Sequence, residues 1–380
     1  MSPKTRAPIG AAIRRAFNGA TASVEASEAY FATGEDLGVS VMNADFGGDV
    51  AVARQIIDTA RASALHTLVV AILLDTPKEE FAATLQQLDD ETSSDEADGR
   101  LMLMPVMLRE NLWRGAIQGL NYVALGEYAL RPVYAAAHAL ACAWRLAGPQ
   151  NDKLNLFISH AKLDGLPLAQ SFRYQLGQLD GLKYFYDAVD IPPGSNWRKV
   201  LREGVETSAL VVLRTNVYEE RAWCVQEMDW AQDFGCPIVI VEARTHLVLT
   251  REFLPTGGSP CVHVPDGNLV RILQVAMHEA LRVRLFVRQI SALESRGLLK
   301  LEETVRVPRS SLPTIGMRCQ AEQARRAKQG SSAAAVQQVL VPEKFRDAHR
   351  QVAQTLVKGW FPDAWFGTPQ DFINKHLATP

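Results

Sequence analysis

Short runs of apolar residues, each about the length of one β-strand, recur along this chain and alternate with amphipathic helical stretches. Residues 66–74 and 101–108 are such runs in the first part of the chain, and residues 154–158, 209–213 and 237–241 are such runs in the middle. A near-continuous apolar run suits a strand that is buried on both faces, as in a parallel sheet covered by helices. The alternation therefore predicts an α/β fold in both regions.

Turn residues and a change of periodicity divide the chain into three parts. Residues 148–152 (Gly-Pro-Gln-Asn-Asp) have the composition of a turn between two periodic regions. Beyond Leu285 the pattern becomes mostly helical. We therefore expect an α/β domain of unknown family, with a sensory or regulatory role, over residues 1–148. A second α/β domain is expected over residues 153–285 and a mainly helical region over residues 286–380.

Aromatic residues are dense near the end of the helical region. They are Trp360, Phe361, Trp365, Phe366 and Phe372. Such side chains pack back onto the protein in most cases, and the alternative is a surface that binds a partner.

Charge and cysteine content argue against several classes of protein. The 40 basic and 42 acidic residues leave a net charge of −2, so no global field favours nucleic acid, and the basic group around Arg325 is expected to be a solvated helix face. Five scattered cysteines without a Cys-x-x-Cys pair argue against a disulfide framework and against a zinc site, and no other metal-ligand cluster is apparent. The pattern favours a reducing compartment.

No membrane association is expected from the sequence. The most apolar stretch, residues 128–146, is interrupted by Arg131 and Arg145, and we interpret it as a buried helix. The first residues are basic but are not followed by the apolar segment of a signal peptide. We therefore expect a cytoplasmic protein.

Polar residues of the middle domain cluster where its predicted strands end. The first strand runs into a polar loop from Ser159 and His160 to Asp164, and the second is followed by a loop from Asp187 to Trp197 that contains Pro-Pro-Gly. Ligands of open parallel sheets bind at the carboxyl ends of the strands. These loops are therefore candidate parts of a binding site.

Three segments of the middle domain resemble the signature boxes of bacterial Toll/interleukin-1 receptor (TIR) domains. They are Phe157-Ile-Ser-His160, the Pro-Gly loop that ends at Trp197, and Tyr218…Trp223-Cys224-x-x-Glu227, which occur in the family's order over about a third of the chain. The resemblance implies a flavodoxin-like fold with a parallel sheet. Many prokaryotic members cleave NAD+ between nicotinamide and ribose, and their catalytic glutamate corresponds to Glu227.

The proposed chemistry explains why one carboxylate would suffice. Nicotinamide leaves without needing much protonation, whereas the ribose passes through an oxocarbenium-like state that a carboxylate stabilises electrostatically. The resemblance places Ser159, His160 and Asp187 at the substrate, and Trp197 and Trp223 could stack on its rings. Trp223 could equally be a core anchor, and a lone histidine such as His160 is more often structural.

Two further residues near Glu227 bear on its surroundings. Cys224 is expected to be buried rather than nucleophilic, because no base has a fixed relation to it. Arg221 and Thr215 stand where the family often has serine. Threonine keeps a hydroxyl for capping, whereas arginine does not replace serine, so the polar lining of the pocket is expected to differ.

The expected function is therefore an NAD+ glycohydrolase that is activated by self-association through TIR domains. NAD+ would be the substrate, and no cofactor or metal is expected. In bacteria such a protein resembles an antiphage defence effector, here with an unknown activating ligand or partner protein. The alternatives are a non-enzymatic TIR adaptor and an enzyme that makes a cyclic form of ADP-ribose.

Overall fold

Two compact units make up the chain. The computed structural model describes residues 51, 54–55, 57–59, 67–73, 83–84, 86–87, 90, 101–107, 123–124, 131–146, 154–177, 182–185, 196–245, 258–263, 269–309, 311–330, 334–342 and 347–377. The long helix α9 (Leu269–Ser295) contributes Val270–Leu281 to the first unit, and the second unit resumes at Arg282.

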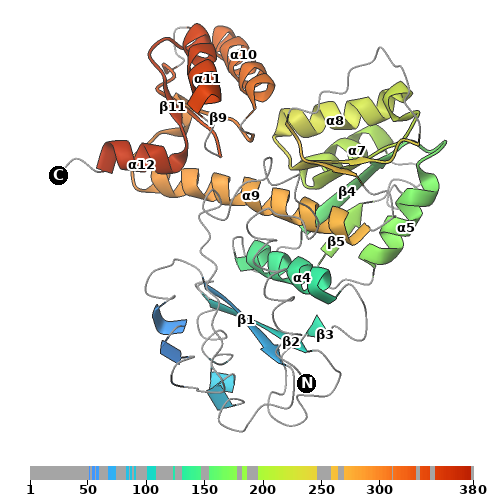
Figure 1. Ribbon diagram of the computed structural model, residues 1–380. Helices are drawn as coiled ribbons and strands as arrows, with labels where there is room; N and C mark the ends of the chain where they lie inside the picture. Colours follow the sequence, from blue (N-terminus) through green and yellow to red (C-terminus); the bar gives the residue numbers. More distant parts are fainter. Residues whose placement is uncertain are drawn as a thin grey trace. The chain divides into compact units, whose positions relative to one another are not determined.

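The first unit contains a small parallel sheet. Its strands are β1 (Thr67–Leu73), β2 (Leu101–Met107) and β3 (Val123–Ala124), and β1 and β2 pair in parallel along their whole length. Helix α4 (Arg131–Leu146) packs against β1 and β2 (Figure 1). The predicted strands at residues 66–74 and 101–108 are thus confirmed. The predicted turn at residues 148–152 lies outside the described residues.

Helix α4 is buried along one stretch, as the sequence indicates. Ala135, Ala139 and Leu140 are fully buried, so the apolar run serves a protein interior. In the described part of the chain, no helix has both the length and the apolar character needed to cross a membrane.

The middle domain alternates strands and helices along the chain. Its elements are β4 (Leu154–His160), α5 (Leu166–Leu176), β5 (Leu182–Phe185), α7 (Trp197–Glu206), β6 (Ala209–Arg214), the short 3-10 helix η2 (Tyr218–Glu220), α8 (Ala222–Phe234), β7 (Ile238–Glu242) and β8 (Cys261–His263).

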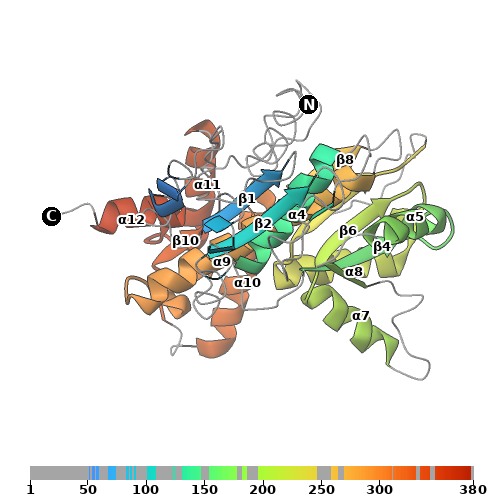
Figure 2. The same ribbon diagram turned by 90° about the horizontal axis from the view of Figure 1, so that it is seen from below.

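These strands form a five-stranded sheet in the order β5-β4-β6-β7-β8. The pairs β4/β6, β6/β7 and β7/β8 are parallel, and Figure 2 shows β4 beside β6. Numbered along the domain the order is 2-1-3-4-5, that of a flavodoxin-like doubly wound sheet. One expectation is wrong: Ser159 and His160 belong to β4, because its pairing with β6 continues through His160 and Leu213, and the loop begins after them.

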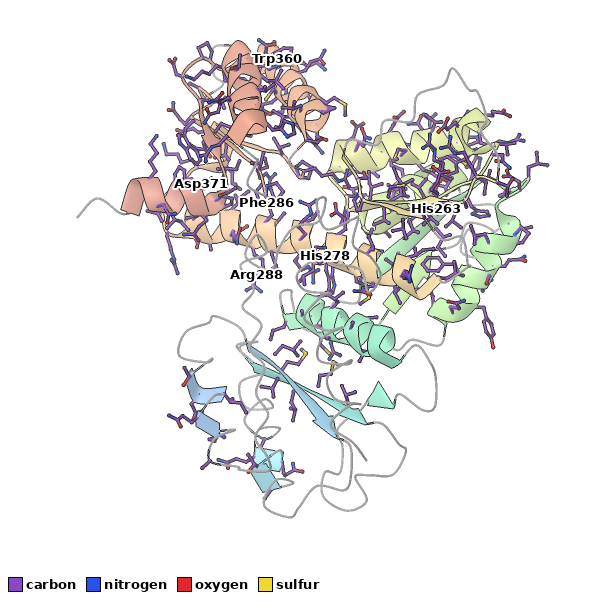
Figure 3. The ribbon with its side chains drawn as sticks, viewed as in Figure 1. His263, His278, Phe286, Arg288, Trp360 and Asp371 are labelled. Carbon is purple, nitrogen blue, oxygen red and sulfur yellow. The ribbon has the colours of Figure 1, made fainter. Side chains whose placement is uncertain are left out.

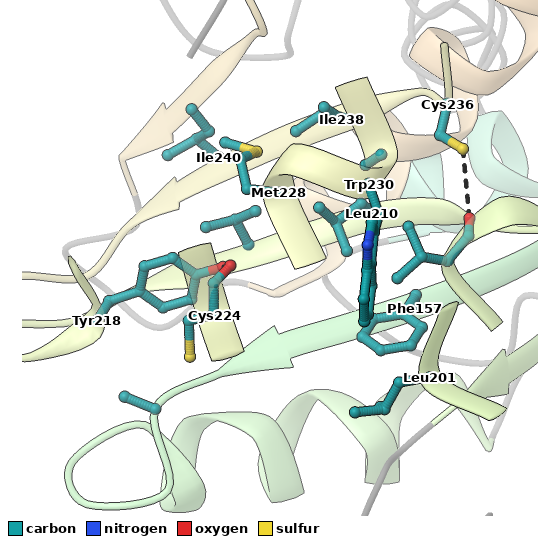
Figure 4. Close-up of a cluster of buried hydrophobic side chains, with 14 residues drawn as sticks. Phe157, Leu201, Leu210, Tyr218, Cys224, Met228, Trp230, Cys236, Ile238 and Ile240 are labelled. Carbon is teal, nitrogen blue, oxygen red and sulfur yellow. Dashed lines mark hydrogen bonds between the residues drawn. The ribbon is translucent and has the colours of Figure 1, made fainter. Parts of the chain in front are cut away.

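One hydrophobic core of the middle domain lies between the sheet and helices α7 and α8. Phe157, Leu210 and Ile238 from three strands pack against Met228 and Trp230 of α8 (Figure 4). Strand β6 is buried at five successive positions, which explains why its sequence is almost purely apolar.

The C-terminal region is less purely helical than its sequence suggests. It contains η3 (Leu301–Glu303), β9 (Thr304–Arg306), α10 (Leu312–Gln329), β10 (Gln338–Leu340), α11 (Asp347–Trp360), β11 (Trp365–Gly367) and α12 (Pro369–Leu377). The three strands form a parallel sheet in the order β11-β10-β9. Because each has only three residues, none stands out as an apolar run in the sequence.

Aromatic side chains of the C-terminal region fill its own core, as expected. Phe366 is buried between the sheet and helices α10 and α11, and Trp360 and Phe361 pack against the same cluster. Phe286 of α9, labelled in Figure 3, is buried with Leu340 and Phe372.

The C-terminal region contacts the end of α8 through arginine side chains. Arg318 donates to the carbonyl oxygens of Gln232 and Asp233, the latter at 3.0 Å, and Arg309 donates to the carbonyl of Cys236 at 3.0 Å. These carbonyls belong to the last turn of α8 and the residues after it, where helix carbonyls lack partners within the helix. Arg318 and Arg309 therefore supply donors to the carbonyls of Asp233 and Cys236, whereas the Gln232 carbonyl also accepts from the amide of Gly235.

Candidate active site

The strand order of the middle domain predicts a candidate ligand site at the carboxyl ends of β4 and β6. The chain leaves β4 for β5 on one side and later crosses to β6 on the other, so the two connections diverge there. Such a switch point, at the carboxyl ends of the strands, is where open α/β sheets bind ligands. Ser159 and His160 end β4, and the segment that leads to η2 and α8 follows β6.

Glu227 meets Ser159 at this edge of the sheet. The Ser159 hydroxyl lies 2.5 Å from Oε2 of Glu227 and 2.6 Å from the hydroxyl of Tyr218. Glu227 is 7% exposed, Ser159 1% and Tyr218 0%. Three elements, β4, η2 and α8, thus bring one carboxyl and two hydroxyl groups together in a largely dry setting.

Two tryptophans lie at the first residues of neighbouring helices. Trp197 begins α7 and Trp223 is the second residue of α8, and their rings meet edge to face with centroids 4.1 Å apart. Both side chains are more than 40% exposed. Trp230, whose ring centroid lies 6.5 Å from that of Trp223, is buried. Trp223 precedes Glu227 by four residues, which is about 6 Å along a helix and on the same face.

The other residues named from the sequence occupy different settings. His160 is buried, and its Nδ1 lies 3.4 Å from the carbonyl oxygen of Ile158. Asp187 lies outside the described residues. Cys224 is buried in the core cluster, as expected (Figure 4). Substrate contacts by Ser159, His160, Asp187 and the two tryptophans stay predictions.

A comparison with models of protein families identifies this domain. The family model described as TIR domain matches residues 156–250, a segment that contains Ser159, Tyr218 and Glu227. Residues 156–250 form a TIR domain. None of the curated proteins that were compared matches the chain.

Asp164 connects the segment that follows β4 to the segment that follows β6. The Thr215 hydroxyl donates to Oδ1 of Asp164 at 2.6 Å, and the amide of Val217 donates to Oδ2 at 3.2 Å. The Thr215 hydroxyl thus bonds to the loop after β4 and does not cap a helix. Arg221 is the N-cap residue of α8 and is exposed, and no side-chain hydrogen bond caps the helix there. The first turn of α8 therefore lacks the acceptor that a serine would supply.

Charged residues at the ends of β6 and β7 form a network beside this site. Arg214 donates to Glu219 at 2.7 Å and to Glu242 at 3.3 Å, and Arg244 donates to Glu242 at 2.6 Å. Burial alone would raise the pKa of Glu242, but the hydrogen bond and charge of Arg244, together with the charge of Arg214, hold it below its usual range. The network fixes the TIR-domain segments that follow β6 and β7.

Sequence reasoning assigned no role to Tyr218 or Asp164, although both lie within the segments it singled out. Tyr218 reads as a buried aromatic residue, which it is, and only the folded TIR domain reveals the partner of its hydroxyl. Across the described residues, no group of three histidine, cysteine or acidic side chains could hold a metal ion.

Proposed function

We propose that the TIR domain cleaves NAD+ between nicotinamide and ribose, with Glu227 as the catalytic carboxylate. The observation that carries this proposal is the position of Glu227. It is largely buried, accepts a hydrogen bond from Ser159, and lies at the edge of the sheet where this topology binds ligands. The TIR family includes NAD+-cleaving enzymes.

The proposed reaction needs one anionic group near the ribose. The bond between C1 of the ribose and the nicotinamide nitrogen breaks, and the electron pair leaves with nicotinamide, which becomes neutral. The positive charge that develops on the ribose is stabilised by the Glu227 carboxylate, most strongly in a setting from which water is largely excluded. Water then attacks C1 and loses a proton, which gives ADP-ribose.

The exposed tryptophan pair is suited to hold a planar ring. In the proposal, Trp197 and Trp223 present apolar surface one helical turn from Glu227, where nicotinamide or adenine can stack. Asp187 and His160 are proposed to contact the remainder of the nucleotide.

Activation is proposed to require association of TIR domains. TIR domains generally mediate such self-association. The protein would then act as a bacterial antiphage effector whose depletion of NAD+ stops growth, once a ligand or partner has brought subunits together.

The test is release of nicotinamide from NAD+ by the purified full-length protein over a range of protein concentrations, with and without a crowding agent. Turnover should rise faster than in proportion to protein concentration. The variant Glu227→Gln keeps the shape of the side chain but loses its charge, and should lower kcat at least about 100-fold. Glu220→Gln, which removes an exposed carboxylate of the same domain, is the matched control and should retain activity.

Chromatography of the products separates ADP-ribose from a cyclic form and so distinguishes hydrolysis from cyclisation. Equal nicotinamide release by the wild type and Glu227→Gln would contradict the catalytic assignment. Absence of release under every condition, together with association seen by analytical ultracentrifugation, would instead support an adaptor that recruits other TIR domains.

A further inference from the structure

The Glu227 carboxylate accepts a hydrogen bond from Ser159, and the Ser159 hydroxyl in turn contacts the hydroxyl of Tyr218. Ser159 comes from β4 and Tyr218 from η2, and both are buried. We propose that Ser159 and Tyr218 form a relay of hydrogen bonds that positions the Glu227 carboxylate for catalysis, without contacting the substrate. This proposal rests on the function proposed above and assigns Ser159 a different role from the substrate contact that its sequence motif suggests.

The number of available protons fixes the direction of the relay. An ionised carboxylate only accepts hydrogen bonds, so the single Ser159 proton is donated to Oε2 of Glu227 across 2.5 Å. The contact of 2.6 Å between Ser159 and Tyr218 must then use the proton of Tyr218. The Cys224 carbonyl, 3.3 Å from the same hydroxyl, is the more distant acceptor. The relay therefore runs from Tyr218 through Ser159 to Glu227.

Burial keeps Tyr218 a donor. Its pKa is raised well above the ordinary value, first by burial and then by the negative charge that Cys224 and Glu227 would carry, although the hydrogen bond with Ser159 acts in the opposite direction. The phenol thus stays protonated in the neutral range. The hydrogen bond that Tyr218 donates to Ser159 polarises the Ser159 hydroxyl and so strengthens its bond to the carboxylate of Glu227.

The relay connects the catalytic helix to the rigid centre of the sheet. Ser159 is the penultimate residue of β4 and pairs with Val212 of β6, so its hydroxyl has little freedom to move. Glu227 has three side-chain torsions that water or neighbouring groups could reorient. Anchoring one carboxyl oxygen to the strand restricts those torsions and holds the group in one orientation toward the ribose.

The test compares Ser159→Ala, Tyr218→Phe and the double variant in the full-length protein. Ser159→Ala should lower kcat for nicotinamide release by about 10- to 100-fold, the loss expected when a charged group loses one hydrogen bond. Tyr218→Phe removes a hydrogen bond between two neutral hydroxyl groups and should lower kcat by about 2- to 10-fold. KM should stay within a few-fold in both variants. Because Tyr218 acts through Ser159, the double variant should lose no more than Ser159→Ala alone. A role in packing alone would give additive losses, and a substrate contact would raise KM.

Tyr174→Phe is the matched control, since Tyr174 is 72% exposed on α5 and should not affect kcat. Circular dichroism and thermal unfolding check that each variant is folded. Tyr218→Phe keeps the ring and removes one oxygen atom, so it separates the hydrogen bond from packing.

Wild-type kcat in folded Ser159→Ala and Tyr218→Phe, with Glu227→Gln inactive, would overturn the relay and leave the proposed function standing. The proposed function would be refuted if the wild type and Glu227→Gln released nicotinamide equally, or if the wild type released none. Either result would also refute the relay, because the relay rests on that function.

Discussion

The turn that ends α8 offers a measurement of how tightly the C-terminal region contacts the TIR domain. Gly235 follows α8 with φ of +74°, and the amides of Gly235 and Cys236 bond back to the carbonyls of Gln232 and Ala231. This is a Schellman motif, which requires a left-handed residue. A Cβ at Gly235 would lie 3.1 Å from Nη2 of Arg318, so alanine both strains the backbone and requires the guanidinium to shift by a few tenths of an ångström.

A matched glycine separates these two effects. Gly297 has φ of +68° after α9 and the same pattern of backbone bonds, but a Cβ there meets no atom within 4 Å. A left-handed alanine costs about 1–2 kcal/mol, and about 0.4–1 kcal/mol is offset by the lower entropy of the unfolded chain. Gly297→Ala should therefore cost about 1 kcal/mol. Gly235→Ala should cost about 2 kcal/mol, since the shift weakens, without breaking, hydrogen bonds from a charged group that are worth about 1.5–3 kcal/mol each.

Urea unfolding followed by circular dichroism and tryptophan fluorescence measures both variants. To test whether Arg318 causes the larger loss at Gly235, Gly235→Ala is made in an Arg318→Ala background, where the arginine is already absent. There, the effect of Gly235→Ala should fall to that of Gly297→Ala. Equal losses for the two glycine variants in the wild-type background would refute the reasoning, as would a loss at Gly235 that does not depend on Arg318.

Three further predictions concern charge, thiol chemistry and helix capping. The pKa of Glu242 is lowered in the folded protein, so its ion pairs stabilise the fold above the unfolded pKa, near 4.5. That stabilisation is lost as the pH falls through the folded pKa. Glu242→Gln should therefore cost about 0.5–1 kcal/mol of unfolding free energy at pH 7 and progressively less below pH 4.5. Burial raises the pKa of the Cys236 thiol to about 12. Partial burial and the charge of Glu242 also raise the pKa of Cys261, but its side chain is exposed whereas Cys236 is buried. Iodoacetamide at pH 9 should therefore label Cys261 and leave Cys236 unmodified in the folded protein, as mass spectrometry of peptides can check. Asn196 accepts from the amide of Lys199 at the start of α7, and Asn196→Ala should lower the free energy of unfolding by about 1 kcal/mol in the same urea assay.

The strands of this chain could be predicted from sequence where they are long, buried and almost purely apolar. The apolar runs that became β6 and β7 are long and buried, so periodicity sufficed. Strands β8, β9, β10 and β11 have three residues each and depend on pairing with a neighbour that sequence cannot reveal. The extension of β4 through His160 was missed for a related reason, because polar residues at a strand end read as a loop.

Part of the candidate site followed from motif order and part required the fold. The resemblance pointed to Glu227 and Ser159, which are 68 residues apart, but not to the hydrogen bond between them. Tyr218 was recognised only as part of a motif, since an aromatic residue at a buried position does not disclose where its hydroxyl points. Local pattern finds the elements, whereas contacts between groups from different elements depend on topology and side-chain geometry.

Contacts between the C-terminal region and the TIR domain bear on how such a gene can recombine. Arg318 and Arg309 satisfy carbonyls beyond the core of α8, Gly235 leaves room for Arg318, and a Cβ on Gly258 would lie 2.7 Å from Cβ of Ser311. A different TIR domain, together with the segment that joins it to this region, would need glycines at the positions of Gly235 and Gly258. We therefore expect these positions to be inherited as one block, with exchange breakpoints falling outside it.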